Sequence, residues 1–355
     1  MWLYLLAVAL LVGILFVIRT LLYWKILGVA GPLPYPIVGN IGKNLIGRKN
    51  VAEVYTDIYR EFKQYPFVGI FRGGTPCILV RDPELIKNIT IKDFKHFNNN
   101  EIFLDKEVDP LLGRNLFVLK DAEWKRERER STPGFSSARI KAVFPLVERV
   151  SEKMVEYVEN EIRLSGNFLN VKEVCTRFTC DNVAVCAFGL EGRCFEESNS
   201  EFRELGQKFV APSSMEGIKF GLSLIVPNLT SLFSLKIVPK EVDDKLLKIV
   251  SQTVEYRKSK EIVRNDFMDF VSQLSYSSNQ NSLVEITAHL ANFFIDGFET
   301  SSVVMSHALY ELAKYEDSQD KLRNEIKDVL KKHNGIFSYD ALQEMTFLDA
   351  CLNGK

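Results

Sequence analysis

The sequence has no excess of charge of either sign. It contains 45 Lys and Arg against 46 Asp and Glu, a formal net charge of -1, so no global basic field favours nucleic acid as a partner. Metal ligands are also scarce, with six cysteines and four histidines dispersed along 355 residues. The spacings of Cys175, Cys180 and Cys186 fit neither a CxxC metal pair nor an iron–sulfur pattern. We therefore predict no metal site from these residues and interpret the cysteines as small buried apolar side chains.

Charged side chains are missing altogether from residues 1–18, and beyond Arg19 the apolar character continues to Trp24. About 20 helical residues cover the roughly 30 Å hydrocarbon core of a bilayer, so we predict that residues 1–24 form a transmembrane anchor. A cleaved signal peptide is the alternative, because Gly28-Val29-Ala30 would suit cleavage. However, the basic region that opens such peptides is missing.

Positive charge dominates the stretch after this apolar segment. Because basic flanks stay cytoplasmic, we expect a single-pass protein whose remaining chain faces the cytosol, with membrane lipid as a partner. Six cysteines without a dense disulfide framework agree with that compartment. The basic residues that precede the first acidic residue, Glu53, are Arg19, Lys25, Lys43, Arg48 and Lys49.

Three of the 12 prolines stand at alternate positions, Pro32, Pro34 and Pro36. Each fixes its own φ and disfavours helix and interior strand around it. We interpret residues 25–40 as a basic, Pro-rich hinge between the anchor and a domain that spans residues 41–355.

The domain is predicted to be mainly α with a small β-sheet. Two β-rich runs, residues 67–71 and 76–80, are joined by Arg72-Gly73-Gly74-Thr75, which is typical of a hairpin. Residues 215–238 are apolar with Pro and Gly breaks, and they either dip into the lipid interface or form a buried loop. Apolar spacing typical of helices recurs at residues 140–164, 171–188, 200–210, 242–277 and 283–315.

A glycine, Gly297, lies in the middle of the helix predicted at residues 283–315. Because glycine costs about 1 kcal/mol in a helix interior, it calls for a packing or a functional reason. Close approach of a flat ligand is one reason and helix–helix packing is the other. The neighbouring Thr300 can bond back to a helix carbonyl, and Glu299 supplies a titratable group, so the pair is suited to holding dioxygen and relaying protons.

Trp124 and Arg128 are four residues apart and share one face of a predicted helix. An indole N–H and a guanidinium are good donors to a carboxylate, and the guanidinium is charged at any relevant pH. The pair therefore suits a propionate group, with an amphipathic surface helix and a partly buried Trp as the alternative.

In combination, these features resemble the microsomal cytochrome P450 family. The resemblance runs from about residue 30 to residue 353 and is closest to the insect-type, xenobiotic-metabolising branch. Each motif is moderately specific, but their order along the chain matches the family. The motifs are Gly31–Asn40, Asp109-Pro110-Leu111, Asn115-Leu116-Phe117, Trp124 with Arg128, Pro133–Ser137, Ala187-Phe188-Gly189 and Gly297–Ser302.

The resemblance implies haem as the cofactor, with NADPH acting through a reductase partner. It implies that Trp124 and Arg128 bond a haem propionate and that Gly297 lies over the haem. It further implies that Glu299 and Thr300 are catalytic residues that assist oxygen activation.

The resemblance also implies a pocket for a lipophilic small-molecule substrate, to which we assign Phe117, Phe293 and Asp296. Asp296 departs from the family, which has a small residue before the glycine, and it would change the polarity of the pocket. The implied location is the endoplasmic reticulum membrane. The face on which NADPH-cytochrome reductase would dock, for which a solvated charged surface is the alternative, includes Lys125, Arg126, Arg130 and Arg139.

None of the six cysteines lies in the sequence context that ligates iron in this family. The chain departs from the family at Gly354, where the family has the glutamate that opens its next helix. We therefore expect an amino-terminal part of a membrane-bound haem-thiolate monooxygenase, truncated before the haem cysteine and inactive in this form. The alternative is a non-catalytic, membrane-anchored helical fragment or partner-binding protein.

Overall fold

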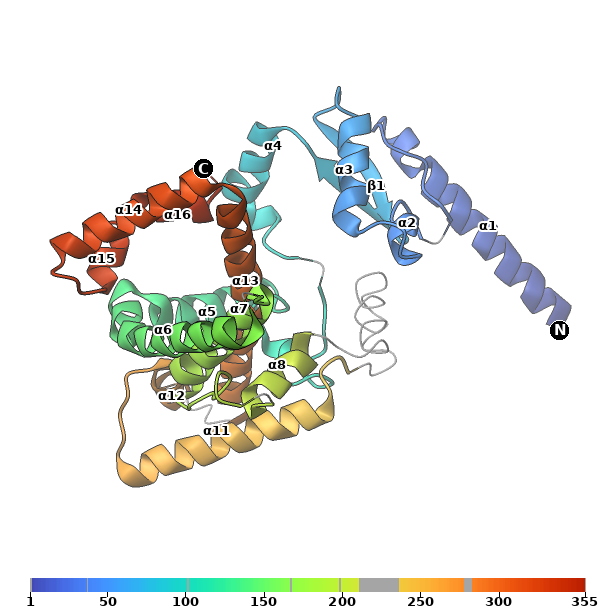
Figure 1. The fold of residues 1–355 in the computed structure, drawn as a ribbon. Coiled ribbons are helices and arrows are strands. Elements are labelled where there is room, and N and C mark those ends of the chain that lie inside the picture. The colour runs from blue at the N-terminus through green and yellow to red at the C-terminus, as the bar shows by residue number, and fades with distance from the viewer. Residues whose placement is uncertain are drawn as a thin grey trace. The chain divides into compact units, whose positions relative to one another are not determined.

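The computed structural model describes residues 2–36, 38–100, 102–166, 168–197, 199–210, 236–277 and 283–354. They form two compact units, one from the described residues up to Phe103 and one from those after it (Figure 1). Helices dominate, and the one sheet in these ranges has two strands, which confirms the predicted mainly α composition with a small sheet. The predicted apolar segment at residues 215–238 lies outside the described residues as far as residue 235.

The first unit contains the predicted hairpin. Strands β1 (Phe67–Arg72) and β2 (Thr75–Val80) pair antiparallel, and Gly73, with a φ of 58°, and Gly74 form the tight turn. Helix α3 (Val51–Glu61) buries its apolar face against β1. The other helices of this unit are α1 (Trp2–Ile26), α2 (Gly42–Leu45) and α4 (Pro83–Lys87).

The end of α1 and the Pro-rich segment after it are hydrogen-bonded to β1. The Trp24 indole donates to the Ile70 carbonyl at 3.0 Å, and the Phe71 amide donates to Asn40 Oδ1 at 2.7 Å. Gly31 is needed here because a Cβ would collide with the Gly69 carbonyl. None of the helices in the described part of the chain combines the length and the apolar character that crossing a membrane requires.

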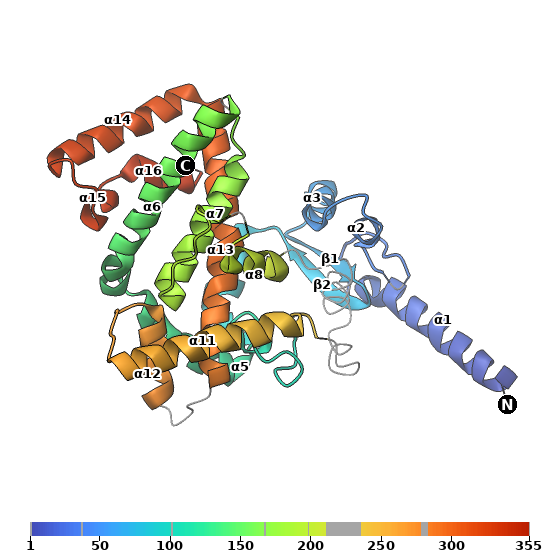
Figure 2. The ribbon, with the colours of Figure 1, turned by 60° about the horizontal axis from the view of Figure 1, so that its bottom comes forward.

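The second unit is built around α13 (Leu283–Lys314), which contacts α7 (Val171–Val183) along its length (Figure 2). The helix predicted at residues 283–315 is thereby confirmed, whereas the spacing at 242–277 is split in two by a break at residues 261–266, where Glu261 adopts a φ of 51°. The remaining helices of this unit are α5 (Asp121–Ser131), α6 (Ser137–Ser165), α8 (Glu201–Val210), α11 (Lys240–Lys260), α12 (Phe267–Ser277), α14 (Glu316–Lys332), α15 (Tyr339–Gln343) and α16 (Thr346–Leu352).

Phenylalanines form the centre of the second unit's core. Phe294 and Phe298 of α13 stack with ring centroids 5.6 Å apart, and Phe188 and Phe202 close the cluster at 5.3 Å from each other. All four are almost completely buried. Each such burial stabilises the fold by about 1.5–3 kcal/mol, so this face of α13 is fixed toward α8 and the end of α7.

A buried ion pair lies just beyond the end of α7. The Arg257 guanidinium donates to both carboxylate oxygens of Asp266, at 2.8 and 2.6 Å, and to the Phe188 carbonyl at 3.3 Å. Gly189 follows with a φ of 66° and lies directly against these two charged groups. Removing one partner would leave the other charge buried and unpaired, which makes this network structurally sensitive.

The contact at Gly189 predicts a large cost for Gly189→Ala. The left-handed φ alone costs a side chain about 1–2 kcal/mol. A Cβ would also collide with the Arg257 guanidinium, which adds about 1–3 kcal/mol of overpacking. Gly166→Ala is the matched control, because its φ is also 66° but its Cβ would meet no atom within 4 Å. Urea unfolding followed by circular dichroism should show the larger loss for Gly189→Ala, and equal losses would contradict the collision.

Candidate functional site

Helix α13 presents different faces to different neighbours. One face carries Phe294 and Phe298 into the core described above. A second carries Phe293, Gly297 and Ser301, at intervals of four residues, into a cavity. A third carries Asp296 and Thr300, both exposed. Of the predicted site residues, Phe293 and Gly297 therefore lie on the second face, and Asp296 and Thr300 lie on the third.

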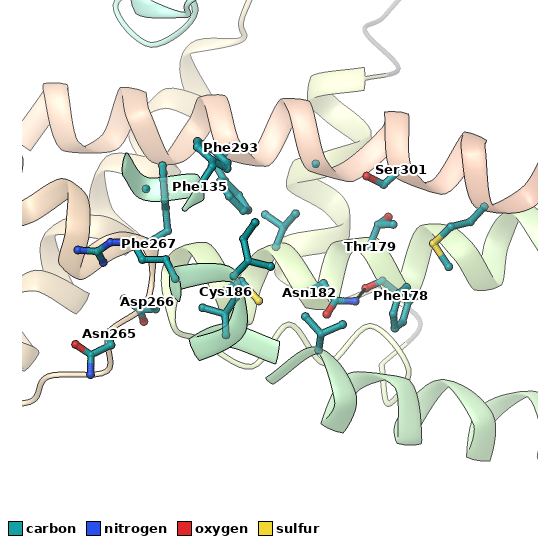
Figure 3. Close-up of a pocket in the computed structure, with 18 residues that line it drawn as sticks. Phe135, Phe178, Thr179, Asn182, Cys186, Asn265, Asp266, Phe267, Phe293 and Ser301 are labelled. Carbon is teal, nitrogen blue, oxygen red and sulfur yellow. Dashed lines mark hydrogen bonds between the residues drawn. The ribbon is translucent and has the colours of Figure 1, made fainter. Parts of the chain in front are cut away.

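The cavity has a volume of about 380 Å³ and lies among α6, α7, α12 and α13. Its walls are mostly apolar, and Phe135, Phe267 and Phe293 gather at one end (Figure 3). The Phe135 and Phe293 rings stack with centroids 6.0 Å apart. Phe293, which we predicted in a substrate pocket, is thus part of an aromatic cluster on this face.

Gly297 lies against α7. A Cβ at Gly297 would approach Val183 Cγ2 to 3.2 Å, which is tighter than nine in ten real Cβ contacts. The glycine therefore has a packing reason, because a side chain here would press on the Val183 side chain. This is the packing explanation that the sequence left open, and it stands beside the predicted position over a haem.

Cys186 is the cysteine that lines this cavity. Its side chain is buried, and desolvation raises the pKa of the thiol to about 11. Burial also raises the pKa of Cys175. Burial therefore disfavours the thiolate form of both side chains, which is the form that binds a metal.

The exposed face of α13 carries the polar groups suited to chemistry. The Thr300 hydroxyl donates to the Asp296 carbonyl one turn earlier, as expected for a threonine that bonds back within its helix. Asp296 is exposed on one side, but protein atoms around it remove part of its water, and this desolvation raises the pKa of its carboxyl. A carboxyl and a hydroxyl thus share one accessible stripe.

Glu299 is directed toward α7 and not toward this stripe. Its carboxylate pairs with Lys172 at 3.0 Å. Lys172 also donates to the Ser302 hydroxyl at 2.6 Å, and that hydroxyl donates to the Glu299 carbonyl at 2.8 Å. Glu299 and Thr300 are neighbours in sequence, yet a three-residue polar network holds Glu299 on a different side of the helix.

Helix α5 contacts the first turns of α13. Arg130 of α5 pairs with Glu285 at 3.3 Å, and Glu127 lies 3.8 Å from His289. Glu127, Glu285 and His289 bring their ligand atoms within 4.8 Å of one another, a cluster that the dispersed histidines in the sequence did not reveal. Arg130 shares this cluster and pairs with Glu127 at 3.0 Å, so its carboxylates already have a cation. Desolvation lowers the pKa of His289, which is neutral at pH 7.

The two α5 residues predicted to bind a propionate lie on the same helix as this contact. Trp124 is half-buried and Arg128 is exposed. Within the described ranges, the Arg128 guanidinium makes no hydrogen bond or ion pair with the protein. Phe117, in the loop before α5, is 62% exposed. Helix α5 therefore presents an available guanidinium and contacts α13 at Glu285 and His289.

The mainly helical fold with its small sheet fits the result of comparison with known proteins. The model of the cytochrome P450 family matches residues 29–353. The chain therefore belongs to the cytochrome P450 family, as the ordered motifs predicted.

The relatives are insect proteins of this family. The chain is 35% identical over 337 residues to probable cytochrome P450 6a23 of Drosophila melanogaster, covering 92% of this chain and 66% of that protein. It is 33% identical over 352 residues to cytochrome P450 6a2 of the same species, covering 94% and 69%. With cytochrome P450 6j1 of Blattella germanica the identity is 32% over 340 residues, covering 96% and 68%. The chain thus spans about two thirds of the length of these curated relatives, and it is of the insect type.

Family membership implies a haem cofactor, and the described residues fit part of it. Arg128 is exposed and has no protein partner in the described ranges, and Asp296 and Thr300 are exposed on α13. The donor set for the iron does not fit equally well, because burial raises the pKa of Cys186, which lines the same cavity as Gly297. The chain therefore offers polar groups that suit the edge of haem, while burial disfavours the thiolate form of Cys175 and Cys186.

The raised pKa of Cys186 predicts slow alkylation in the folded protein. The thiolate is the reactive form, and a shift from 9.0 to about 11 lowers its population about 100-fold at pH 8. Iodoacetamide labelling followed by peptide mass spectrometry should show this deficit relative to the same thiol in urea. Because the unfolded chain ionises this thiol first, its contribution to stability is present below about pH 9 and is lost as the pH rises toward 11. Equal labelling rates in buffer and in urea at pH 8 would refute the burial effect.

Proposed function

We propose that the protein is a membrane-bound haem-thiolate monooxygenase that oxidises lipophilic small molecules with dioxygen and with electrons from NADPH-cytochrome reductase. The observation that carries the proposal is a set of accessible polar groups: Asp296 and Thr300 are exposed on one face of α13, and Arg128 of α5 has no protein partner in the described ranges. Bound haem supplies the iron centre that activates dioxygen, with a cysteine thiolate as its ligand in this family.

Trp124 and Arg128 would hold a haem propionate. A guanidinium keeps its charge at every relevant pH, and charge-assisted hydrogen bonds to a carboxylate are about twice as strong as neutral ones. Because Arg128 makes no ion pair in the described part of the chain, binding a propionate costs no existing protein contact.

Thr300 and Glu299 would handle protons from two sides of α13. The Thr300 hydroxyl donates a hydrogen bond to the Asp296 carbonyl, so the hydroxyl oxygen of Thr300 can accept a further hydrogen bond on the open face. Glu299 can exchange protons with solvent on the α7 side, where Lys172 orients it. Asp296 supports this role, because its raised pKa brings its titration closer to neutral pH.

The reductase would dock on basic side chains of α5 and the start of α6. Lys125 and Arg126 are exposed and suit an acidic partner surface. Arg130 is engaged with Glu127 and Glu285, and Arg139 lies over the Phe270 ring at 4.6 Å. Arg126 also pairs with Glu127, at 3.1 Å, but its side chain stays 63% exposed, so we assign docking to Lys125 and Arg126 in preference to the other two.

The haem proposal predicts different results for two arginine substitutions in the full-length protein. Arg128→Ala should weaken haem binding about tenfold, because a hydrogen bond to a charged group contributes about 1.5–3 kcal/mol and this site is exposed. Arg163→Ala, on the exposed surface of α6, is the control and should leave haem affinity unchanged. Haem titration followed by Soret absorption measures both.

The reduced, carbonyl-bound spectrum of the same protein tests the thiolate. Because none of the six cysteines lies in the sequence context that ligates iron in this family, we expect no thiolate signature from residues 1–355 alone. A thiolate signature would contradict this expectation and sink the non-catalytic alternative, whereas a failure to take up any haem would sink the monooxygenase proposal and favour a non-catalytic, partner-binding role. Equal haem affinities for Arg128→Ala and Arg163→Ala would show that Arg128 does not bind haem.

We also propose that residues 1–24 attach the protein to the endoplasmic reticulum membrane. Apolar side chains of α1 are exposed, among them Leu10, Leu15 and Ile18. Burying such side chains in lipid is favourable at about 25 cal/mol per Å². Deletion of residues 1–24 should therefore release most of the protein from phosphatidylcholine vesicles in a flotation assay. Leu10→Ser/Leu15→Ser should weaken attachment in part, and flotation of the deletion variant with the vesicles would contradict the proposal.

A further inference from the structure

The cavity among α6, α7, α12 and α13 has no part in the proposed activity. Asp296 and Thr300, which lie on the neighbouring face of α13, are not among the described residues that line it. Its volume of about 380 Å³ falls within the roughly 300–1,000 Å³ that is typical of small-molecule sites. The cavity is therefore large enough for a ligand of its own, on the α7 side of α13.

One end of this cavity is aromatic (Figure 3). The Phe267 ring lies 4.7 Å from the Phe293 ring and 5.5 Å from the Phe135 ring, measured between centroids. Phe135 is 53% exposed, so the cluster can be reached from solvent. Aromatic rings gain stabilisation from contact with other rings beyond the area that they bury, so this end favours a flat aromatic group over an aliphatic chain.

Arg139 of α6 supplies a positive charge to the same cavity. Its guanidinium lies 4.6 Å from the centre of the Phe270 ring, which in turn lies 5.8 Å from the Phe267 ring. In the described part of the chain this guanidinium makes no hydrogen bond or ion pair. Asp266 also lines the cavity, but both of its carboxylate oxygens are bonded to Arg257. Within these ranges the charge of Arg139 is therefore left without a carboxylate, close to the aromatic end.

We propose that this cavity binds a small aromatic carboxylate, with its ring against Phe135, Phe267 and Phe293 and its carboxylate on Arg139. A guanidinium matches a carboxylate with two parallel hydrogen bonds, and such charge-assisted bonds are stronger than neutral ones. A neutral aromatic molecule gains the ring contacts alone. The inference goes beyond the proposed monooxygenase function, and it requires no haem.

Calorimetric titration of the full chain with 2-naphthoate and with 2-naphthol tests the charge. Arg139→Met should weaken 2-naphthoate binding about fivefold to tenfold, the discount being for a half-exposed site, because methionine keeps an apolar contact with Phe270 but carries no charge. Binding of the neutral 2-naphthol should change less than about twofold, since it uses the ring contacts. Arg163→Met is the matched control on the same helix, because Arg163 pairs with Glu159 on the exposed surface and should leave both affinities unchanged.

Alkylation of cysteines tests the location. Cys186 lines the cavity, so saturating 2-naphthoate should slow its labelling by iodoacetamide in the folded protein. Cys77, a partly exposed cysteine of the first unit, is the internal control and should be labelled at an unchanged rate. Arg139→Lys keeps the charge, so it should recover part of the 2-naphthoate affinity that Arg139→Met loses.

Three results would overturn the inference. An equal loss of 2-naphthoate and 2-naphthol binding in Arg139→Met would show that Arg139 acts through packing. An unchanged 2-naphthoate affinity in that variant, with its helical circular dichroism intact, would show that the carboxylate does not meet Arg139. Labelling of Cys186 at the same rate with and without 2-naphthoate would place the ligand elsewhere.

Discussion

The packing of α13 against α7 decides what each face of α13 meets, and Gly297 lies in that contact against the Val183 side chain. The helix gives up about 1 kcal/mol of intrinsic propensity at this position. A Cβ here would stand 3.2 Å from Val183 Cγ2, so the Val183 side chain would have to shift by a few tenths of an ångström. With α13 in this orientation, Phe294 enters the core and Thr300 is directed to the open side.

Polar contacts accompany this packing at both ends of α7. At its start Lys172 bonds to Ser302 and pairs with Glu299, and past its end Arg257 binds the Phe188 carbonyl. A buried charge is costly unless paired, so the Arg257 contacts define one arrangement more than they add net stability. Helix α7 is thus held to α13 by the bonds of Lys172 at its start and by the Val183 contact at its end.

The same physical cause sets several protonation states around α13. Apolar neighbours remove water from Cys186, His289 and Asp296, and each group moves toward its neutral form: the thiol and the carboxyl have raised pKa values, and the imidazole has a lowered one. Desolvation thus favours the uncharged forms of these three groups, while Arg128 on α5 offers an available guanidinium to an acidic cofactor edge. The proposed function uses this combination.

The sequence by itself determined the elements that depend on local patterns. The turn at Gly73 specifies the hairpin, apolar spacing specifies the helix from Leu283, and the order of motifs specifies the family. Tertiary structure alone decided which groups meet. It directed Glu299 to α7, and it joined Asn115 to Asn292 across 177 positions. Helical periodicity tells which residues share a face, but the neighbour of that face is set by packing between distant segments, which no local pattern records.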